Sequence, residues 1–277
     1  MGCTLPLFRV PLGIVDVMDT LHFERYEYKY LVPEAWTEAI RRFIHPYVEL
    51  DKHAARAPDR RYTIHSVYLD TPNLDLYTAA VRDEVDRFKL RIRSYDDDLN
   101  GPFFCEVKRK IRQVIVKDRA LISRRDCDAL LSGQPITLPA GASADNLAAF
   151  QERAVRTGAI PMLFSRYTRE PYESVFGEYS RITFDRAMCF QMFAGAGFHE
   201  DPDAWTYIDG AGAMHGLPCA MVVELKFTRN FPRWMSDLVA EFDLERRRYS
   251  KFVSAVSHHL QSGFGGPDFQ RHAWIDG

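Results

Sequence analysis

The 277-residue chain lacks the features that define several large protein classes. Its five cysteines (Cys3, Cys105, Cys127, Cys189 and Cys219) are scattered, odd in number and never spaced as CxxC, so neither a disulfide framework nor a cysteine zinc site is indicated. No apolar run approaches the ~20 residues that span a bilayer. Arg9 also breaks the order of a signal peptide. We therefore expect a protein of the reducing cytoplasm.

An excess of one charge sign is missing as well. Lys and Arg total 36 against 38 for Asp and Glu, a net charge of −2, so nothing global indicates nucleic acid or a membrane as partner. The chain is 46% hydrophobic and long enough to bury a core. We expect one domain over residues 21–262, with a loose arm over 1–20 and a tail over 263–277.

Alternation of charged and apolar residues dominates the chain. Asp86–Tyr95 reads DRFKLRIRSY, which places its basic residues on one face of a strand and its apolar residues on the other. Further strands are predicted over 23–32, 62–70, 103–122 (two strands joined near Gln113), 162–174, 178–191 and 219–228. Helices are predicted over 33–48, 74–81, 123–133, 143–158 and, as a pair, 232–260. The two helices between 123 and 158 are interpreted as an insert or lid. The pattern favours an α+β fold with a dominant antiparallel sheet or barrel.

The charged faces of six predicted strands are strongly basic. They carry four acidic residues, Glu27, Glu106, Asp185 and Glu224, and eleven basic ones: Arg25, Lys29, Arg87, Lys89, Arg91, Arg93, Lys108, Lys110, Arg166, Arg181 and Lys226. Any one of these strands is also explained as the solvated face of a half-exposed sheet. Like charges on neighbouring strands repel, however, so the concentrated excess needs a counter-anion. We predict that this counter-anion is a polyanion.

Phosphate chemistry fits these residue types. Arginine binds phosphate oxygens through a planar fork, and lysine adds a compact charge. Carboxylates among phosphates usually hold Mg²⁺ or Mn²⁺, which makes Glu27, Glu106 and Glu224 candidate metal ligands. Ion pairing with a lysine two residues along the strand explains the same glutamates equally well. Tyr26 and Tyr28 are expected to pack under helices rather than to stack on bases.

Eight motifs in fixed order resemble the vacuolar transporter chaperone (VTC) catalytic domain, a polyphosphate polymerase family within the triphosphate tunnel metalloenzymes. They are RYEYKYLV, SVYLDTPNLDLY, DRFKLRIRSY, FFCEVKRK with KDR, SRYTREPY, RITFD, VVELKF and RRRYSKF, and they cover roughly Phe23 to Leu260. The resemblance implies an antiparallel eight-stranded β-tunnel with surrounding helices, a basic interior and a C-terminal helix closing one end. It also implies transfer of the ATP γ-phosphate to a growing polyphosphate chain.

Carried over motif by motif, the resemblance assigns a phosphate path and a metal ligand. Glu224 would hold Mn²⁺ or Mg²⁺, with Glu27 and Glu106 as further candidates. Arg25, Lys89 and Lys110 would be secondary phosphate ligands. The phosphate path itself would be lined by Lys29, Arg91, Arg93, Lys108, Arg166, Arg181, Lys226 and Lys251.

One residue departs from the family pattern, and the role of another has a second explanation. The tunnel superfamily begins with ExExK, but this chain has Arg25 in place of the first glutamate, which favours the polymerase-like branch over a two-metal triphosphatase. Lys251 is also explained as an ordinary helix lysine that reaches solvent.

Three functions fit the sequence. The first is a metal-dependent phosphotransferase that acts on ATP and polyphosphate or pyrophosphate. The second is a tripolyphosphatase or nucleoside triphosphatase at the same site, and the third is a polyphosphate or inositol-phosphate binding module without turnover. A nucleic-acid partner is not expected, because the basic face is predicted to be internal and the net charge is slightly acidic. Neither the acceptor, the product length nor the oligomeric state follows from the sequence.

Overall fold

The computed structural model describes residues 25–95, 97–111, 114–134, 136, 142–195, 197–210 and 220–264. The predicted arm over 1–20 and the tail beyond 264 lie outside the described residues. The strands are β1 (Arg25–Pro33), β2 (Val48–Leu50), β3 (Tyr62–Asp70), β4 (Asp86–Ser94), β5 (Phe103–Ile111), β6 (Val114–Ile122), β7 (Ile160–Ser174), β8 (Ser180–Met192), β9 (Thr206–Tyr207) and β10 (Ala220–Thr228). The helices are α1 (Thr37–Ile44), α2 (Asp75–Val81), α3 (Arg124–Leu131), α4 (Ala142–Thr157), α5 (Arg233–Glu241) and α6 (Lys251–Phe264), with 3-10 turns η1 (Glu34–Trp36) and η2 (Ala54–Arg56).

One antiparallel sheet organises the molecule, as the α+β prediction required. Its eight main strands run in the order β1-β10-β8-β7-β3-β4-β5-β6, while the short strands β2 and β9, which were not predicted, pair with β7 and β8. The sheet curls, so that β5 near one edge approaches β1 at the other and Lys108 Nζ lies 3.2 Å from Glu27 Oε2. Within the described residues β1 and β6 do not pair. The sheet is therefore a curled but open version of the expected tunnel.

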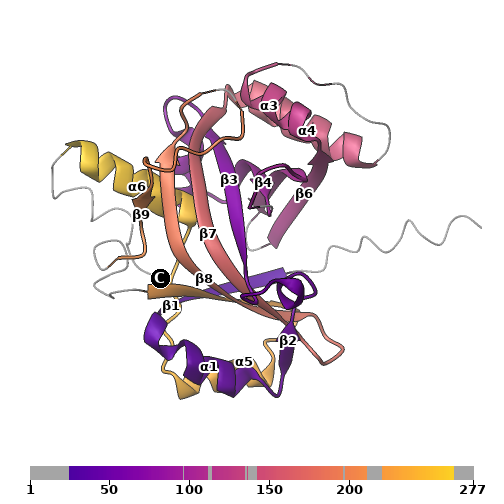
Figure 1. Cartoon of the computed structure of the whole chain (residues 1–277), viewed down its shortest axis with the longest axis vertical. Coiled ribbons are helices and arrows are strands. Elements are labelled where there is room, and N and C mark those ends of the chain that lie inside the picture. Colours follow the sequence, from indigo (N-terminus) through magenta and orange to yellow (C-terminus); the bar gives the residue numbers. More distant parts are fainter. Residues whose placement is uncertain are drawn as a thin grey trace, which may run out of the picture.

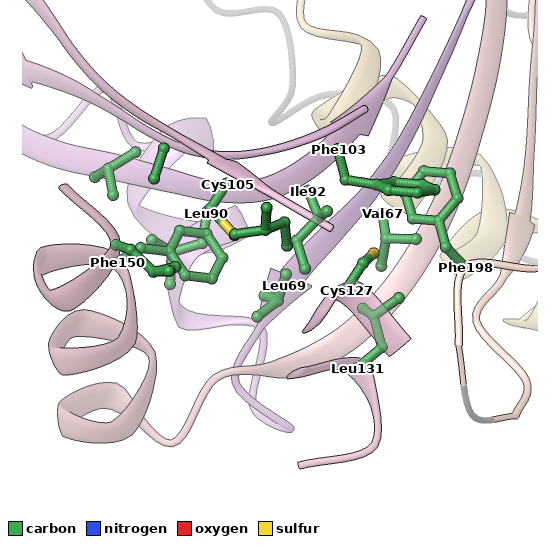
Figure 2. Close-up of a cluster of buried hydrophobic side chains, with 14 of the residues drawn as sticks. Val67, Leu69, Leu90, Ile92, Phe103, Cys105, Cys127, Leu131, Phe150 and Phe198 are labelled. Carbon is green, nitrogen blue, oxygen red and sulfur yellow. The ribbon is translucent and has the colours of Figure 1, made fainter. Parts of the chain in front are cut away.

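Helices α3 and α4 cover the outer face of β4, β5 and β6. Leu90 and Ile92 of β4 pack with Phe103 and Cys105 of β5 beneath Phe150 of α4, all fully or almost fully buried (Figure 2). The predicted helical insert therefore forms part of the core rather than a lid. Figure 1 shows these two helices on the opposite side of the strands from α1 and α5.

Helices α1 and α5 cover the outer face of β1, β10 and β8. Ile40 of α1 and Met235 of α5 are fully buried there. Tyr26 stacks on Phe227 at a centroid distance of 5.3 Å, and Tyr28 lies 5.4 Å from Phe231. The expectation that these tyrosines serve packing is confirmed.

Helix α6 lies against the inner side of the curl, beside the strands in Figure 1. Phe252 in its first turn stacks on Tyr68 of β3 at 4.9 Å. The segment before α6 runs along the free edge of β1. There the Arg247 amide donates to the Lys29 carbonyl at 2.8 Å, and the backbone of Arg246 forms an isolated antiparallel β-bridge with Tyr30. The start of α6 is thereby fixed inside the curl. No described helix is long and apolar enough to cross a bilayer.

Candidate functional site

The inner face of the curled sheet carries the charged residues that alternate with the outer core. Four carboxylates lie there: Glu27, Glu106, Asp185 and Glu224. Ten cations surround them: Lys29, Lys89, Arg91, Arg93, Lys108, Lys117, Arg119, Arg169, Lys226 and Lys251. We call this set the inner cluster. It comes from seven strands and the first residue of α6, and positive charge exceeds negative charge within it.

Glu224 of β10 is the most heavily paired carboxylate of the inner cluster. Its oxygens lie 2.8 Å from Lys226, 3.1 Å from Arg169, 3.3 Å from Lys251 and 3.6 Å from Lys29. Burial to 4% exposure would raise the pKa of Glu224, but these cations outweigh it and hold the pKa well below its ordinary value. Glu224 is therefore ionised at neutral pH. Lys251 is buried as well, which excludes the alternative of a lysine that reaches solvent.

Arg169 was missed by the sequence analysis, and Arg166 was placed on the wrong face. β7 pairs with β3 without interruption from Arg169 opposite Tyr62 to Arg166 opposite His65, so the two arginines, three residues apart, point to opposite faces of the sheet. Arg169 donates to both oxygens of Asp185, at 2.7 and 2.6 Å. Arg166 lies outside the inner cluster, where it pairs with Glu200 at 3.3 Å over the Trp205 ring.

Glu27 joins the two edges of the sheet. It lies 3.0 Å from Lys29 on its own strand and 3.2 Å from Lys108 on β5. Burial would raise the pKa of Glu27, but Lys108 and Lys29 outweigh it and lower the pKa well below its ordinary value. Glu27 and Glu224 both contact Lys29, so the two carboxylates flank one ammonium group.

Glu106 forms a separate group on β4, β5 and β6. Its Oε2 accepts from Arg91 at 2.6 Å, and its Oε1 lies 2.6 Å from Lys117 and 3.4 Å from Arg119. Lys117 and Arg119 were not predicted, although their alternation along KDR repeats the inner-face parity of β5. Burial lowers the pKa of Lys117 to about 8 despite its pairing with Glu106. Glu106 shares no cation with Glu27 or Glu224 in the described structure, so the three predicted metal ligands are not brought together.

Two cations of the inner cluster contact no carboxylate in the described structure. Lys89 donates to Ser250 Oγ at 2.7 Å, and the charges nearest to it are Lys29, Lys108 and two arginines. Burial and these like charges hold the pKa of Lys89 well below its ordinary value. Arg93 donates to Ser66 at 3.1 Å and to the Tyr167 hydroxyl at 3.3 Å. Lys89 therefore lacks a compensating negative charge, which a phosphate would supply. Arg93 forms no direct ion pair, but although burial would lower its pKa, Tyr167 and the nearby Glu106 carboxylate raise that pKa.

The remaining predicted residues lie at the margins. Arg181 pairs with Asp51 and Glu173, each at 3.1 Å, next to Lys226 across the β8–β10 pairing. Lys110 reaches Asp83 at 3.6 Å. The side chain of Arg25 lies outside the described residues.

A divalent metal fits this interior only jointly with phosphate. Among the described residues no three His, Cys, Asp or Glu side chains gather into a protein-only metal centre. Mg²⁺ is commonly held by one or two carboxylates and completed by substrate phosphate oxygens. Glu27 and Glu224, both ionised and both beside Lys29, match that donor set, whereas Glu106 lies apart from them and shares no cation with either in the described structure.

The fold and the site together define a curled antiparallel sheet whose interior is cationic and bears carboxylates. Residues 24–259 match the family model described as the VTC domain. The chain belongs to the VTC domain family, and the predicted resemblance is confirmed.

Solved structures with similar folds come from two other organisms. One is a Bacillus halodurans protein provisionally assigned as an adenylate cyclase, with 12% identity, coverage of 82% of this chain and 95% of that chain, and a TM-score of 0.46. Another is the PH1819 protein of Pyrococcus horikoshii, with 14% identity, coverage of 86% and 99%, and a TM-score of 0.41. Among proteins of curated function, none matches this chain.

Proposed function

We propose that this protein is a metal-dependent phosphotransferase that moves the γ-phosphoryl group of ATP onto a phosphate or polyphosphate acceptor. The observation that carries the proposal is the excess of positive charge in the inner cluster, where Lys89 contacts no carboxylate and Arg93 forms no direct ion pair. Several fixed cations on one face of a sheet repel each other unless a polyanion binds. A linear phosphate chain has the charge density and the extended shape that this arrangement requires.

For phosphoryl transfer the protein needs to position the substrates and stabilise charge, and it needs no nucleophile of its own. In phosphoryl transfer the attacking and leaving oxygens are aligned, and charge spreads over the transferred group. Arg91, Arg93 and Arg169 would hold the phosphates through their planar guanidinium groups. Lys29, Lys108, Lys226 and Lys251 would contribute compact charges along the chain of phosphates, and Arg181 would act at the margin.

Glu224 and Glu27 would hold Mn²⁺ or Mg²⁺ together with phosphate oxygens. A bound divalent ion neutralises charge on the phosphates and polarises the phosphorus–oxygen bond. Lys29 would be displaced from these carboxylates toward a phosphate when the ion binds. We assign Glu106 a different role, as the group that orients Arg91.

The test is incubation of the purified protein with Mn²⁺ and γ-labelled ATP, with and without pyrophosphate as primer, followed by separation of products on a gel. A ladder of labelled polyphosphate that disappears in Glu224→Gln and Arg93→Gln supports the proposal. Arg156→Lys serves as the matched control, because Arg156 is 79% exposed on α4 and pairs with Glu152 rather than with the inner cluster.

Other products would replace the proposal with a specific alternative. Label found only in orthophosphate would establish a tripolyphosphatase or nucleoside triphosphatase. Tight binding of tripolyphosphate without turnover, unchanged in Glu224→Gln, would establish a binding module.

A further inference from the structure

An aromatic group lies beside the Glu106 side of the inner cluster. Phe104 of β5 pairs in register with Arg93 of β4, and Tyr95 follows two residues after Arg93. The rings of Tyr95 and Phe104 meet edge to face at 5.8 Å, and Tyr62 of β3 meets Tyr95 at 5.9 Å. Phosphate binding uses none of these rings.

Arg119 of β6 joins this aromatic group to the inner cluster. Its guanidinium carbon lies 3.5 Å from the centroid of the Phe104 ring and 5.4 Å from that of Tyr95. Its Nε lies 3.4 Å from Glu106, the carboxylate that also binds Arg91. The side chain is 39% exposed, so part of the stacked guanidinium remains accessible to solvent.

A stacked arginine is a recognised platform for a nucleobase. Bases stack on aromatic rings and on guanidinium planes, and these contacts tolerate sequence differences because every base has a π-face. Tripolyphosphate has no such face and gains nothing from this platform. The platform and the phosphate-binding arginines are neighbours on β4, β5 and β6, so one nucleoside triphosphate can contact both.

We propose that Arg119, held on Phe104, stacks on the base of the nucleoside triphosphate and so fixes the orientation of the substrate in the curl. The base lies at the Tyr95 and Phe104 end, and the phosphates run past Arg93 and Arg91 toward Lys89 and Glu224. This inference rests on the proposed function, since it assigns the nucleoside end of the same substrate. It makes Phe104 and Arg119 determinants of the preference for ATP over inorganic polyphosphate.

The test compares two ligands by isothermal titration calorimetry in EDTA, which prevents turnover. ATP and tripolyphosphate are titrated into the wild type, Arg119→Lys, Phe104→Leu and the control Arg156→Lys. Lysine keeps the charge of Arg119 but lacks the planar face. We expect ATP to bind about tenfold more weakly to Arg119→Lys and Phe104→Leu. Tripolyphosphate affinity should change by less than about twofold, because charge dominates that contact.

Each other result overturns one specific statement. Equal losses for ATP and tripolyphosphate would show that Arg119 is only a phosphate ligand. Unchanged ATP affinity in both variants would place the base elsewhere. If neither ligand binds the wild type in EDTA or in Mn²⁺, the proposed function fails together with the inference, whereas tripolyphosphate binding with no advantage for ATP removes the inference alone.

Discussion

Two buried carboxylate groups on opposite faces of the same sheet differ in their charge balance. On the outer face, Glu170 accepts two hydrogen bonds from Arg41 of α1, at 2.7 and 2.6 Å, and lies 3.3 Å from Arg186. Glu38 and Glu34 provide further negative charge to the same two arginines. In the inner cluster, four carboxylates face ten cations.

This difference in charge balance indicates that the outer ion pairs stabilise the fold and that the inner cluster serves binding. The outer group has no excess of positive charge, since three carboxylates face two arginines, and it joins α1 to the sheet. Removal of Glu170 would therefore leave a buried arginine without its partner. The inner cluster is unbalanced, so removal of a cation relieves repulsion and removes a ligand contact instead. Stability and affinity should therefore respond in opposite ways on the two faces.

The largest effect is expected for Arg93→Gln. This change removes a guanidinium that hydrogen-bonds to hydroxyl groups and forms no direct ion pair, so folding loses little while a charge-assisted contact to phosphate disappears. We expect tripolyphosphate affinity to fall about 10- to 100-fold. Calorimetry measures the affinity, and the urea midpoint of the same variant should stay close to that of the wild type. A large loss of stability with intact affinity would reverse the assignment of faces.

Glu170→Gln is expected to give the converse result. The amide keeps the size of the side chain but leaves the Arg41 guanidinium without its bidentate partner, which should cost about 1–3 kcal/mol in free energy of unfolding. Urea denaturation followed by circular dichroism measures this loss. Tripolyphosphate affinity at low urea should equal that of the wild type, and a parallel fall in affinity would show that the two faces are not independent.

Lys89→Met should weaken tripolyphosphate binding without lowering the stability of the fold. Lys89 is surrounded by like charges, so the apolar replacement removes repulsion and should leave the unfolding free energy unchanged or raise it by up to about 1 kcal/mol. The same change should weaken tripolyphosphate binding about tenfold. Lys89→Met tested beside the exposed Arg156→Lys distinguishes this effect from a general charge effect.

A smaller effect is expected from pH. Burial lowers the pKa of Lys117 to about 8, and although burial alone would raise the pKa of Tyr95, Arg93 and Lys117 lower it to about 8. As pH rises through 8, Lys117 loses its positive charge and Tyr95 gains a negative one, so both changes oppose a bound polyanion. Tripolyphosphate affinity should fall several-fold between pH 7 and 9. The fall should be shallower in Tyr95→Phe, and an affinity that rises with pH would contradict the sign.

Regular alternation made much of the inner cluster predictable. In β4 and β5 no bulge interrupts the pairing, so Lys89, Arg91 and Lys108 lie on the face that parity assigned to them. In β7 the same rule gave the wrong face, because Arg166 and Arg169 lie three residues apart on opposite faces and only the contact of Arg169 with Asp185 shows which of them points inward. The division of the three glutamates into two groups could not be predicted from the sequence either. Only the pairing of β1 with β10, which sets Lys29 opposite Glu224, shows that Glu27 and Glu224 share Lys29 while Glu106 lies apart.

The central claim, that the unbalanced inner cations bind a phosphate chain, is tested most directly by ligand-induced stabilisation. The urea midpoint is measured with and without tripolyphosphate for the wild type, Glu170→Gln and the double variant Lys89→Met, Arg93→Gln. A ligand that binds only the folded state raises stability in proportion to its affinity. Tripolyphosphate should raise the midpoint equally in the wild type and Glu170→Gln, and far less in the double variant. An equal rise in all three proteins, or none in the wild type, would contradict the claim.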